Sequence, residues 1–317
     1  MAVPLTAAEI FNQTLYTKMP QMLNTNIDLF NRATNNAIQM LSNDIQGAWE
    51  QSWARSLKDI VLYRDPTSTS PIAKASFEEL MHNMIKIGFG TKEIEWTYSK
   101  FEFIRQNPQE AAFIIAQTLV REMLQNSVRM AIGAATTLLS ADSTVTTDKS
   151  AVGDGKMKFE YFIDATRPFG DQYNRIVTWV LSSQQMFDVW KEALKNENHL
   201  FDIGNIKVIR NPLGAPIIIS DEIKDNTGKY TALGLTTGAI TVGNMEKFRD
   251  NHNEINGLAN IKNSYQAEWD QTLSVKNHKF DTSQTPAVTY AKLTQSANWT
   301  KLSANPKEQL GVALITK

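Results

Sequence analysis

The first residues of the chain follow a helical pattern. Over residues 6–46 apolar side chains recur every three to five positions, which predicts a helical segment. Pro20 and the asparagine-rich stretch around Asn24 are expected to interrupt it. An amphipathic segment of this kind must pack against its own domain or against a neighbouring subunit.

The pattern then changes to two extended runs, at 57–63 and 91–98. In the second run, apolar Ile94, Trp96 and Tyr98 alternate with polar residues. A turn-rich stretch at 64–70 and a predicted helix at 77–87 separate the two runs. This order predicts a long excursion of the chain built on a hairpin, although an ordinary surface hairpin fits the periodicity equally well.

A strong helix start follows at residues 107–110, with the sequence Asn-Pro-Gln-Glu. Asparagine is a good N-cap, proline suits the first helical position, and glutamate at the third completes a capping box. The helix could continue to the cluster that begins at Asp142, over about 33 residues and about 50 Å. Its apolar residues cover more than one face, as expected of a helix that meets several neighbours.

The small, polar residues 143–158 predict a connection to a second unit of α/β type. A buried strand at 175–181 and a helix at 184–195 come first. The further predicted strands are Lys207–Ile209, Pro216–Ser220, and a pair, Tyr230–Leu235 and Ala239–Gly243, joined by Thr-Thr-Gly.

The clearest strand pattern covers residues 261–276, where every even position is polar. Such a strand should have one solvated face. We expect it to pair with the extended runs near the long helix, which makes the α/β unit an insertion. Residues 285–317 are then a tail, with an anchor at Trp299 and a final apolar run at 312–315.

Composition narrows the class of protein. The chain has 317 residues, 42% hydrophobic and 21% charged, which predicts one large or two medium folded domains. Its 32 basic and 33 acidic residues give a net charge of -1, which disfavours a DNA-coating protein. The absence of cysteine excludes disulfides, thiolate zinc sites and cysteine nucleophiles. With no secretory signal pattern and no apolar run of about 20 residues, we expect a soluble intracellular product.

No motif for catalysis, a cofactor or a metal ion is present. The four histidines are far apart and lack metal-ligand spacing. Gly88-Phe89-Gly90 starts like a dinucleotide fingerprint, but Glu93 occupies the last glycine position. Ser182-Ser183 lacks the glycines of a nucleophile elbow. We therefore expect no catalytic, cofactor-binding or metal-binding residues.

The order of these parts, from helical arm to tail, resembles the major capsid proteins of tailed bacteriophages, which have the Hong Kong 97 fold. The segments that carry the resemblance are VLYRD (61–65), GFGTKEIEWTYSKFEFI (88–104), NRIVTWVLSSQQMFDVWKEAL (174–194), GAPIIISDEI (214–223) and SANWTKLSANPKEQLGVALITK (296–317). The resemblance implies an α+β fold of five parts. These are an N-terminal arm (1–55), an extended-loop hairpin with flanking strands (56–105), a peripheral domain with a long spine helix (106–150 and 250–284), an inserted α/β axial domain (151–249) and a C-terminal tail (285–317).

The resemblance also implies a structural protein that is not an enzyme. Its subunits would assemble as hexamers and pentamers into an icosahedral shell around the double-stranded DNA of a tailed phage, with no sequence-specific DNA binding and no membrane. Implied partners are other copies, a separate scaffolding protein, a portal and, in some shells, a decoration protein. The location would be the virion, after assembly in the host cytoplasm. Alternatives are an encapsulin-like nanocompartment shell, a tail component and a soluble α/β enzyme.

The resemblance places contacts between subunits on the hairpin excursion and on the arm. The candidate contact residues are Lys58, Tyr63, Arg64, Asp65, Glu93, Trp96, Tyr98, Phe11 and Phe30. If Trp96 contacts a neighbour, its truncation should prevent assembly without unfolding the monomer; if it is interior, the monomer should unfold.

Overall fold

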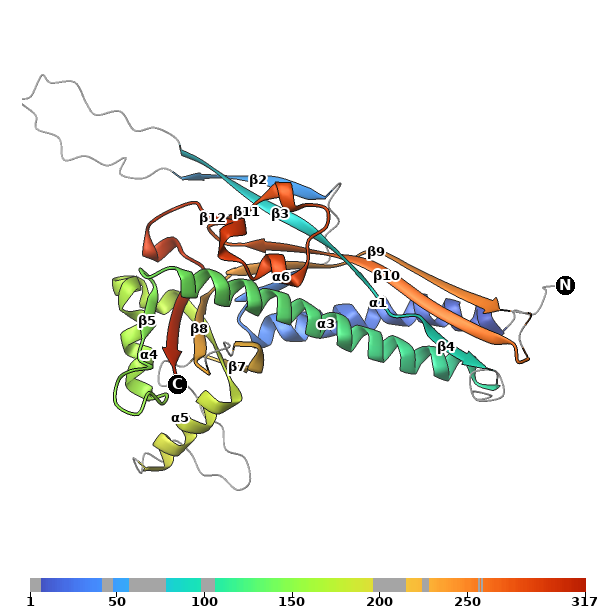
Figure 1. The fold of residues 1–317 in the computed structure, drawn as a ribbon, viewed down its shortest axis with the longest axis horizontal. Coiled ribbons are helices and arrows are strands. Elements are labelled where there is room, and N and C mark those ends of the chain that lie inside the picture. Colours follow the sequence, from blue (N-terminus) through green and yellow to red (C-terminus); the bar gives the residue numbers. More distant parts are fainter. Residues whose placement is uncertain are drawn as a thin grey trace, which may run out of the picture.

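The computed structural model describes residues 7–41, 48–56, 78–97, 106–195, 215–223, 228–255, 257 and 259–317. They form an elongated body in which helix α3 (Pro108–Ala141) runs beside helix α1 (Ala7–Ala33) and reaches an α/β part at its far end (Figure 1). Two hydrophobic cores share α3. Its first half, up to Met123, packs with α1 and a first sheet. Its second half, from Met130, packs with a second sheet and with the part of the first sheet that adjoins it.

Helix α3 confirms the predicted long helix. It has 34 residues and begins directly after Asn107, so it is about 51 Å long at 1.5 Å per residue. Pro108 occupies the first turn, where its missing N–H loses no hydrogen bond. The side chain of Asn107 makes no capping hydrogen bond. The helix start is therefore predicted correctly, but its cap does not form.

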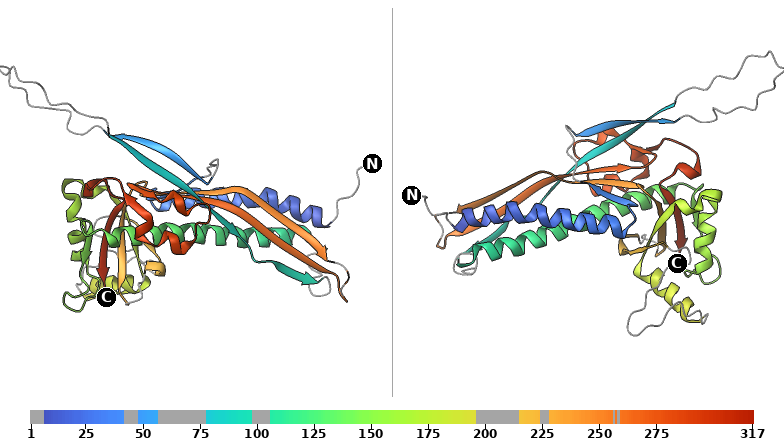
Figure 2. Two further views of the ribbon diagram at one scale, coloured as in Figure 1. Left: turned by 45° about the horizontal axis from the view of Figure 1, so that its top comes forward. Right: turned by 180° about the vertical axis from the view of Figure 1, so that it is seen from behind.

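The first sheet lies along α1 and α3 (Figures 1 and 2). Its described strands are β1 (Ile38–Leu41), β2 (Trp49–Ser56), β3 (Glu78–Gly90), β4 (Ile94–Thr97), β9 (Ile240–Ile255) and β10 (Lys262–Val275). Their order is β1-β9-β10-β3-β2, and β4 pairs with β10 beyond the end of β3. Strands β9 and β10 form a long antiparallel hairpin, with register shifts on either side of Asp270.

The predicted helix at 77–87 is wrong, because this segment is strand β3. Asn83, Ile85 and Ile87 are buried, while the residues between them are more exposed. Pairing with β2 and then with β10 therefore decides the conformation. The predicted run at 57–63 lies outside the described residues. The run at 91–98 contains β4, which pairs with β10.

Helix α1 continues through Pro20, which was expected to interrupt it. After the helix, Asn35 and Asn36 adopt left-handed backbone conformations, with φ of 50° and 55°, and turn the chain into β1. The side chain of Asn31 holds this turn between α1 and β1 in place. Its amide donates to the carbonyl oxygen of Met40 (2.7 Å), and its oxygen accepts from the Met40 N–H (2.8 Å).

Strand β10 follows the predicted alternation over only part of its length. Tyr265, Ala267 and Trp269 are buried and alternate with more exposed polar residues. From Gln271 onwards, residues on both faces are buried. The expectation of one solvated face is therefore wrong for the second half of the strand, which enters the core shared with the second sheet.

The second sheet forms the α/β part. Its described strands, in sheet order, are β5 (Thr146–Asp148), β13 (Gly311–Thr316), β8 (Tyr230–Thr236), β6 (Ile176–Leu181) and β7 (Ile217–Ile219). The helical segments of this part are α4 (Phe159–Thr166), η1 (Arg167–Arg175), α5 (Ser183–Lys195) and η2 (Asp221–Ile223). The predicted strand at 175–181 and helix at 184–195 are confirmed as β6 and α5.

Two connections differ from the predictions. The expected hairpin at 230–243 does not form, because β8 lies in the second sheet and β9 in the first. The turn between them carries the chain from one sheet to the other. The apolar run at 312–315, expected in a tail, is strand β13, which lies between β5 and β8.

Strands β13 and β8 approach closely at two glycines. A Cβ on Gly311 would lie 2.0 Å from the carbonyl oxygen of Gly234. A Cβ on Gly234 would lie 2.9–3.1 Å from side-chain atoms of Val312, Trp179 and Ile176. Glycine is therefore required at position 311, where the obstacle is backbone, while a Cβ at position 234 would force the neighbouring side chains to shift.

The chain between β10 and β13 packs against α3 and β3. Its elements are β11 (His278–Phe280), η3 (Thr282–Gln284), α6 (Tyr290–Leu293), η4 (Ser296–Asn298), β12 (Trp299–Lys301) and η5 (Pro306–Glu308). Tyr290 lies on Gly133 of α3, where a Cβ would come within 2.6 Å of the tyrosine oxygen. The Arg129 guanidinium lies 4.7 Å from the centre of the same ring. This segment is therefore attached to the long helix and is not a free tail.

Candidate assembly surfaces

Strand β2 and the first half of β3 form a two-stranded ribbon that extends past the rest of the first sheet (Figures 1 and 2). Residues 49–56 pair antiparallel with 78–85, and β3 is the only described strand beside β2. Ile85 is the residue at which the pairing of β3 changes from β2 to β10, because it is opposite both Trp49 of β2 and Leu273 of β10.

The base of the ribbon is fixed by Asn83, which is buried. Its amide donates to the carbonyl oxygen of Phe280 (2.8 Å), and its side-chain oxygen accepts from the Phe280 N–H (2.9 Å). Phe280 in turn packs edge-to-face on Trp299, with ring centres 4.9 Å apart. The ribbon therefore projects from a well-packed base.

Two predicted contact residues, Phe11 and Trp96, lie inside the chain. They are 2% and 6% exposed. Both rings pack on His252 of β9, at centre distances of 6.4 Å for Phe11 and 5.5 Å for Trp96. This corrects the expectation for both residues, because their side chains have almost no surface left for a neighbouring subunit.

Of the other predicted contact residues, one is partly buried, one is exposed and five lie outside the described residues. Phe30 is partly buried against both cores. Glu93 is exposed in the short connection between β3 and β4. Lys58, Tyr63, Arg64, Asp65 and Tyr98 lie outside the described residues, and their contacts stay a prediction.

Polar contacts also hold α1 to the β9–β10 hairpin. The Tyr16 hydroxyl donates to the carboxylate of Asp250, and this hydrogen bond is the main reason why the pKa of Tyr16 is raised, with burial adding to it. Tyr16 packs edge-to-face on Phe248, with ring centres 6.1 Å apart. Burial, followed by the Asp250 charge, raises the pKa of Tyr265 above its usual range. The arm helix is therefore attached to the hairpin by side chains along its first half.

An ion pair joins the end of α3 to β12. Lys301 Nζ lies 2.5 Å from Asp142 Oδ2, and the Asp142 side chain is 13% exposed. Burial raises the pKa of Asp142, but hydrogen bonds from Lys301 and Thr144 outweigh burial, so its pKa is lowered overall. The charged form of Asp142 therefore stabilises the fold.

We expect Asp142→Asn to reduce stability at pH 7 by about 1 kcal/mol, the usual value of one such contact. A carboxyl group whose pKa is lower in the folded state contributes stability above its unfolded pKa and loses it as pH falls through the folded value. The difference between wild type and variant should therefore shrink below about pH 4. Urea unfolding at several pH values measures the difference in the free energy of unfolding, and a difference that does not change as pH falls would contradict the assignment.

Sequence reasoning missed the large apolar side chains that stay exposed. They include Leu29, Phe113, Ile114, Val152, Ile163, Tyr173, Phe187 and Ile219. Phe113 and Ile114 belong to the same dense apolar pattern as the buried residues of α3, so the sequence does not separate them, whereas Leu29 and Phe187 fall between the buried positions of their helices. Exposed side chains of this size are candidates for contacts with other chains.

Chemical sites are not evident in the described ranges. No three His, Asp or Glu side chains there are grouped so that they could hold a metal ion. Among the described helices, none combines the length and the apolar character needed to cross a bilayer.

Solved structures define the class of this fold. The chain is similar to one in the head of Helicobacter pylori bacteriophage KHP40, with a TM-score of 0.55, 9% identity and 88% of each chain covered. It is also similar to a chain in the capsid of cyanophage Pam1, with a TM-score of 0.55, 10% identity and 88% of each chain covered. The expected α+β capsid fold is therefore confirmed.

The family is shown by the sequence itself. Residues 7–313 match the Gp13-like family, described as major capsid protein 13-like, and the chain belongs to this family. No curated protein sequence matches it. The chain is thus a structural protein of a phage capsid, which assembles into a shell and is located in the virion. The family match favours this role over an encapsulin-like nanocompartment shell and over a soluble α/β enzyme.

Proposed function

We propose that copies of this protein assemble as hexamers and pentamers into an icosahedral shell around double-stranded DNA. The proposal combines the capsid family with a near-neutral chain that carries no bulk positive charge, so that the wall can surround DNA without binding it tightly. In this shell the first sheet with α1 and α3 is the peripheral domain, and the second sheet is the axial domain.

The projecting β2–β3 ribbon is the observation that carries the proposed mode of assembly. A two-stranded ribbon on its own is at best marginally stable in water. Beyond Ile85 this one pairs with no further described strand of its own chain. In the proposal the ribbon and residues 57–77 lie over a neighbouring subunit, where Lys58, Tyr63, Arg64 and Asp65 make contacts. Glu93, in the connection between β3 and β4 at the other end of β3, would make a separate contact.

Other partners follow from the same proposal. Helix α1 packs on its own chain. In the proposal, shells of uniform size assemble with a separate scaffolding protein in the host cytoplasm, and a portal admits the DNA. A decoration protein would bind the finished shell.

Removal of residues 57–77 tests the role of the ribbon. Ser56 and Glu78 are opposite each other in the β2–β3 register, so an inserted Asn-Gly turn can close the hairpin without strain. We expect a folded subunit that no longer forms closed shells in electron microscopy, when co-expressed with the neighbouring phage genes.

A second variant keeps the length and composition of residues 57–77 but shuffles their order. If contacts are specific, it should also fail to assemble while its circular dichroism and melting temperature match wild type. Normal shells from the shortened chain would disprove the proposed role of the ribbon.

A further inference from the structure

An open groove runs between α1 and α3, on the side of the helix pair that other described elements leave uncovered. It consists of two depressions. One, of about 710 Å³, includes Ile10, Lys18, Glu110 and Phe113 in its lining. The other, of about 500 Å³, is lined by Met22, Asn26, Gln117, Thr118, Val120, Arg121, Leu124 and Gln125.

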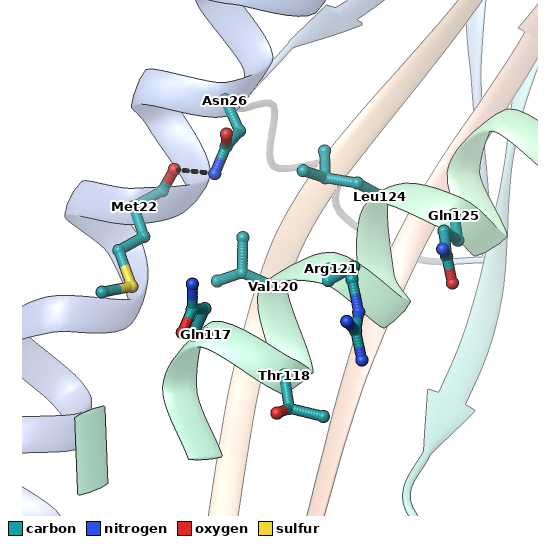
Figure 3. A pocket seen from close by; sticks show the side chains of 8 residues that line it. All are labelled: Met22, Asn26, Gln117, Thr118, Val120, Arg121, Leu124 and Gln125. Carbon is teal, nitrogen blue, oxygen red and sulfur yellow. Dashed lines mark hydrogen bonds between the residues drawn. The ribbon is translucent and has the colours of Figure 1, made fainter. Parts of the chain in front are cut away.

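The groove has an apolar floor and a polar rim. In the second depression Val120 and Leu124 point from α3 towards α1, where Met22 lies (Figure 3). In the first, Phe113 keeps 44% of its surface exposed. The rest of the lining consists mainly of amide and hydroxyl side chains. Such a surface fits an amphipathic helix, which lays its apolar face between two others.

The length of the groove sets the size of its occupant. The two helices run in the same direction (Figure 1), and the lining on α3 extends from Gln109 to Gln125. This span is about 24 Å, so a helix of about 16 residues would fill it. Its anchors would recur at the i, i+3, i+4, i+7 spacing of an apolar stripe.

The charged residues that line the groove indicate which residues should flank the apolar stripe of the bound helix. Lys18 lies on the α1 side of the groove and Arg121 on the α3 side, and both are exposed. The lining contains one carboxylate, Glu110, at the end where α3 begins. A helix in the groove would therefore have a cation on each side of its apolar stripe.

The same charges argue against a second copy of this groove as the occupant. In a two-fold contact the same patch meets itself. Two copies of the groove would then bring four cations and only two carboxylates, Glu110 of each copy, into one contact, and this excess of like charge is unfavourable. We propose that the groove between α1 and α3 binds an amphipathic α-helix of another protein, whose apolar stripe is flanked on both sides by carboxylates.

The test uses the full-length, unassembled protein and three fluorescein-labelled synthetic peptides of about 16 residues. One has a leucine stripe with glutamate on both flanks, one has lysine in place of glutamate, and one has the glutamate composition in scrambled order. Fluorescence anisotropy measures binding. We expect the glutamate peptide to bind more tightly than the other two.

Charge reversal in the protein provides the decisive comparison. The double variant Lys18→Glu, Arg121→Glu should weaken binding of the glutamate peptide about tenfold and favour the lysine peptide, because two exposed charge pairs are exchanged. The double variant Lys92→Glu, Lys156→Glu, at two exposed lysines outside the groove, makes the same change in net charge and should leave both affinities unchanged.

Three outcomes would overturn the proposal. Equal binding of the glutamate and lysine peptides would remove the charge argument. Absence of binding by any peptide would remove the groove as a helix site. A change of oligomeric mass in light scattering on the double reversal, without peptide binding, would show that the groove is a contact between copies.

Discussion

Gly311→Ala should unfold the α/β part of the subunit. The new methyl group would lie 2.0 Å from the carbonyl oxygen of Gly234, in the strand beside it. This oxygen belongs to the backbone of a central strand, so it can move only if β8 and β13 separate. We expect a loss of about 4 kcal/mol or more, a large part of the stability of an ordinary domain.

Thermal unfolding of unassembled subunits, followed by circular dichroism, measures this loss. Gly88→Ala is the matched control, because its Cβ would meet only the Asp270 side chain at an ordinary 3.6 Å. It should change stability by less than about 1 kcal/mol. A Gly311→Ala protein as stable as wild type would show that β13 does not pair with β8 in the register Gly311–Leu235.

Trp96→Ala should destabilise the monomer before any effect on assembly is seen. The indole is 6% exposed, packs on His252 and belongs to the core between α1, α3 and the first sheet. Truncation of a buried tryptophan costs about 3 kcal/mol. The melting temperature of the unassembled subunit should therefore fall.

Ile94→Ala in the same strand is the control, since Ile94 is 43% exposed. It should leave the melting temperature nearly unchanged. If Trp96→Ala instead melts like wild type but forms no shells, the indole would be a contact between subunits, as the sequence resemblance implied, and its buried position would be refuted.

Elements whose conformation is determined within one segment of the chain could be predicted from the sequence, and elements that depend on distant strands could not. The start at Asn107-Pro108 and the long apolar pattern after it were enough to predict α3, because both act within one helix. Strand β3 was mistaken for a helix because its conformation depends on β2 and β10, which are distant in the sequence. The position of β13 between β5 and β8 was missed for the same reason.

The contact surface was predicted less well than the fold. The excursion was expected, and its base is the β2–β3 ribbon. Phe11 and Trp96 were nominated as aromatic contacts, but an aromatic residue in an alternating or helical pattern has the same spacing whether it faces its own core or a neighbour. The groove between α1 and α3 could not be predicted, because it depends on how two separate helices pack.

The central position of β13 has a consequence for protein synthesis. The ribosome makes residues 311–316 after every other described strand of the second sheet. That sheet cannot be completed during most of translation, so its folding follows release of these residues. A chain that stops earlier lacks the strand between β5 and β8 and leaves two unpaired strand edges. Such a product is prone to aggregation and degradation, so the fold itself selects against incorporation of truncated subunits into a shell.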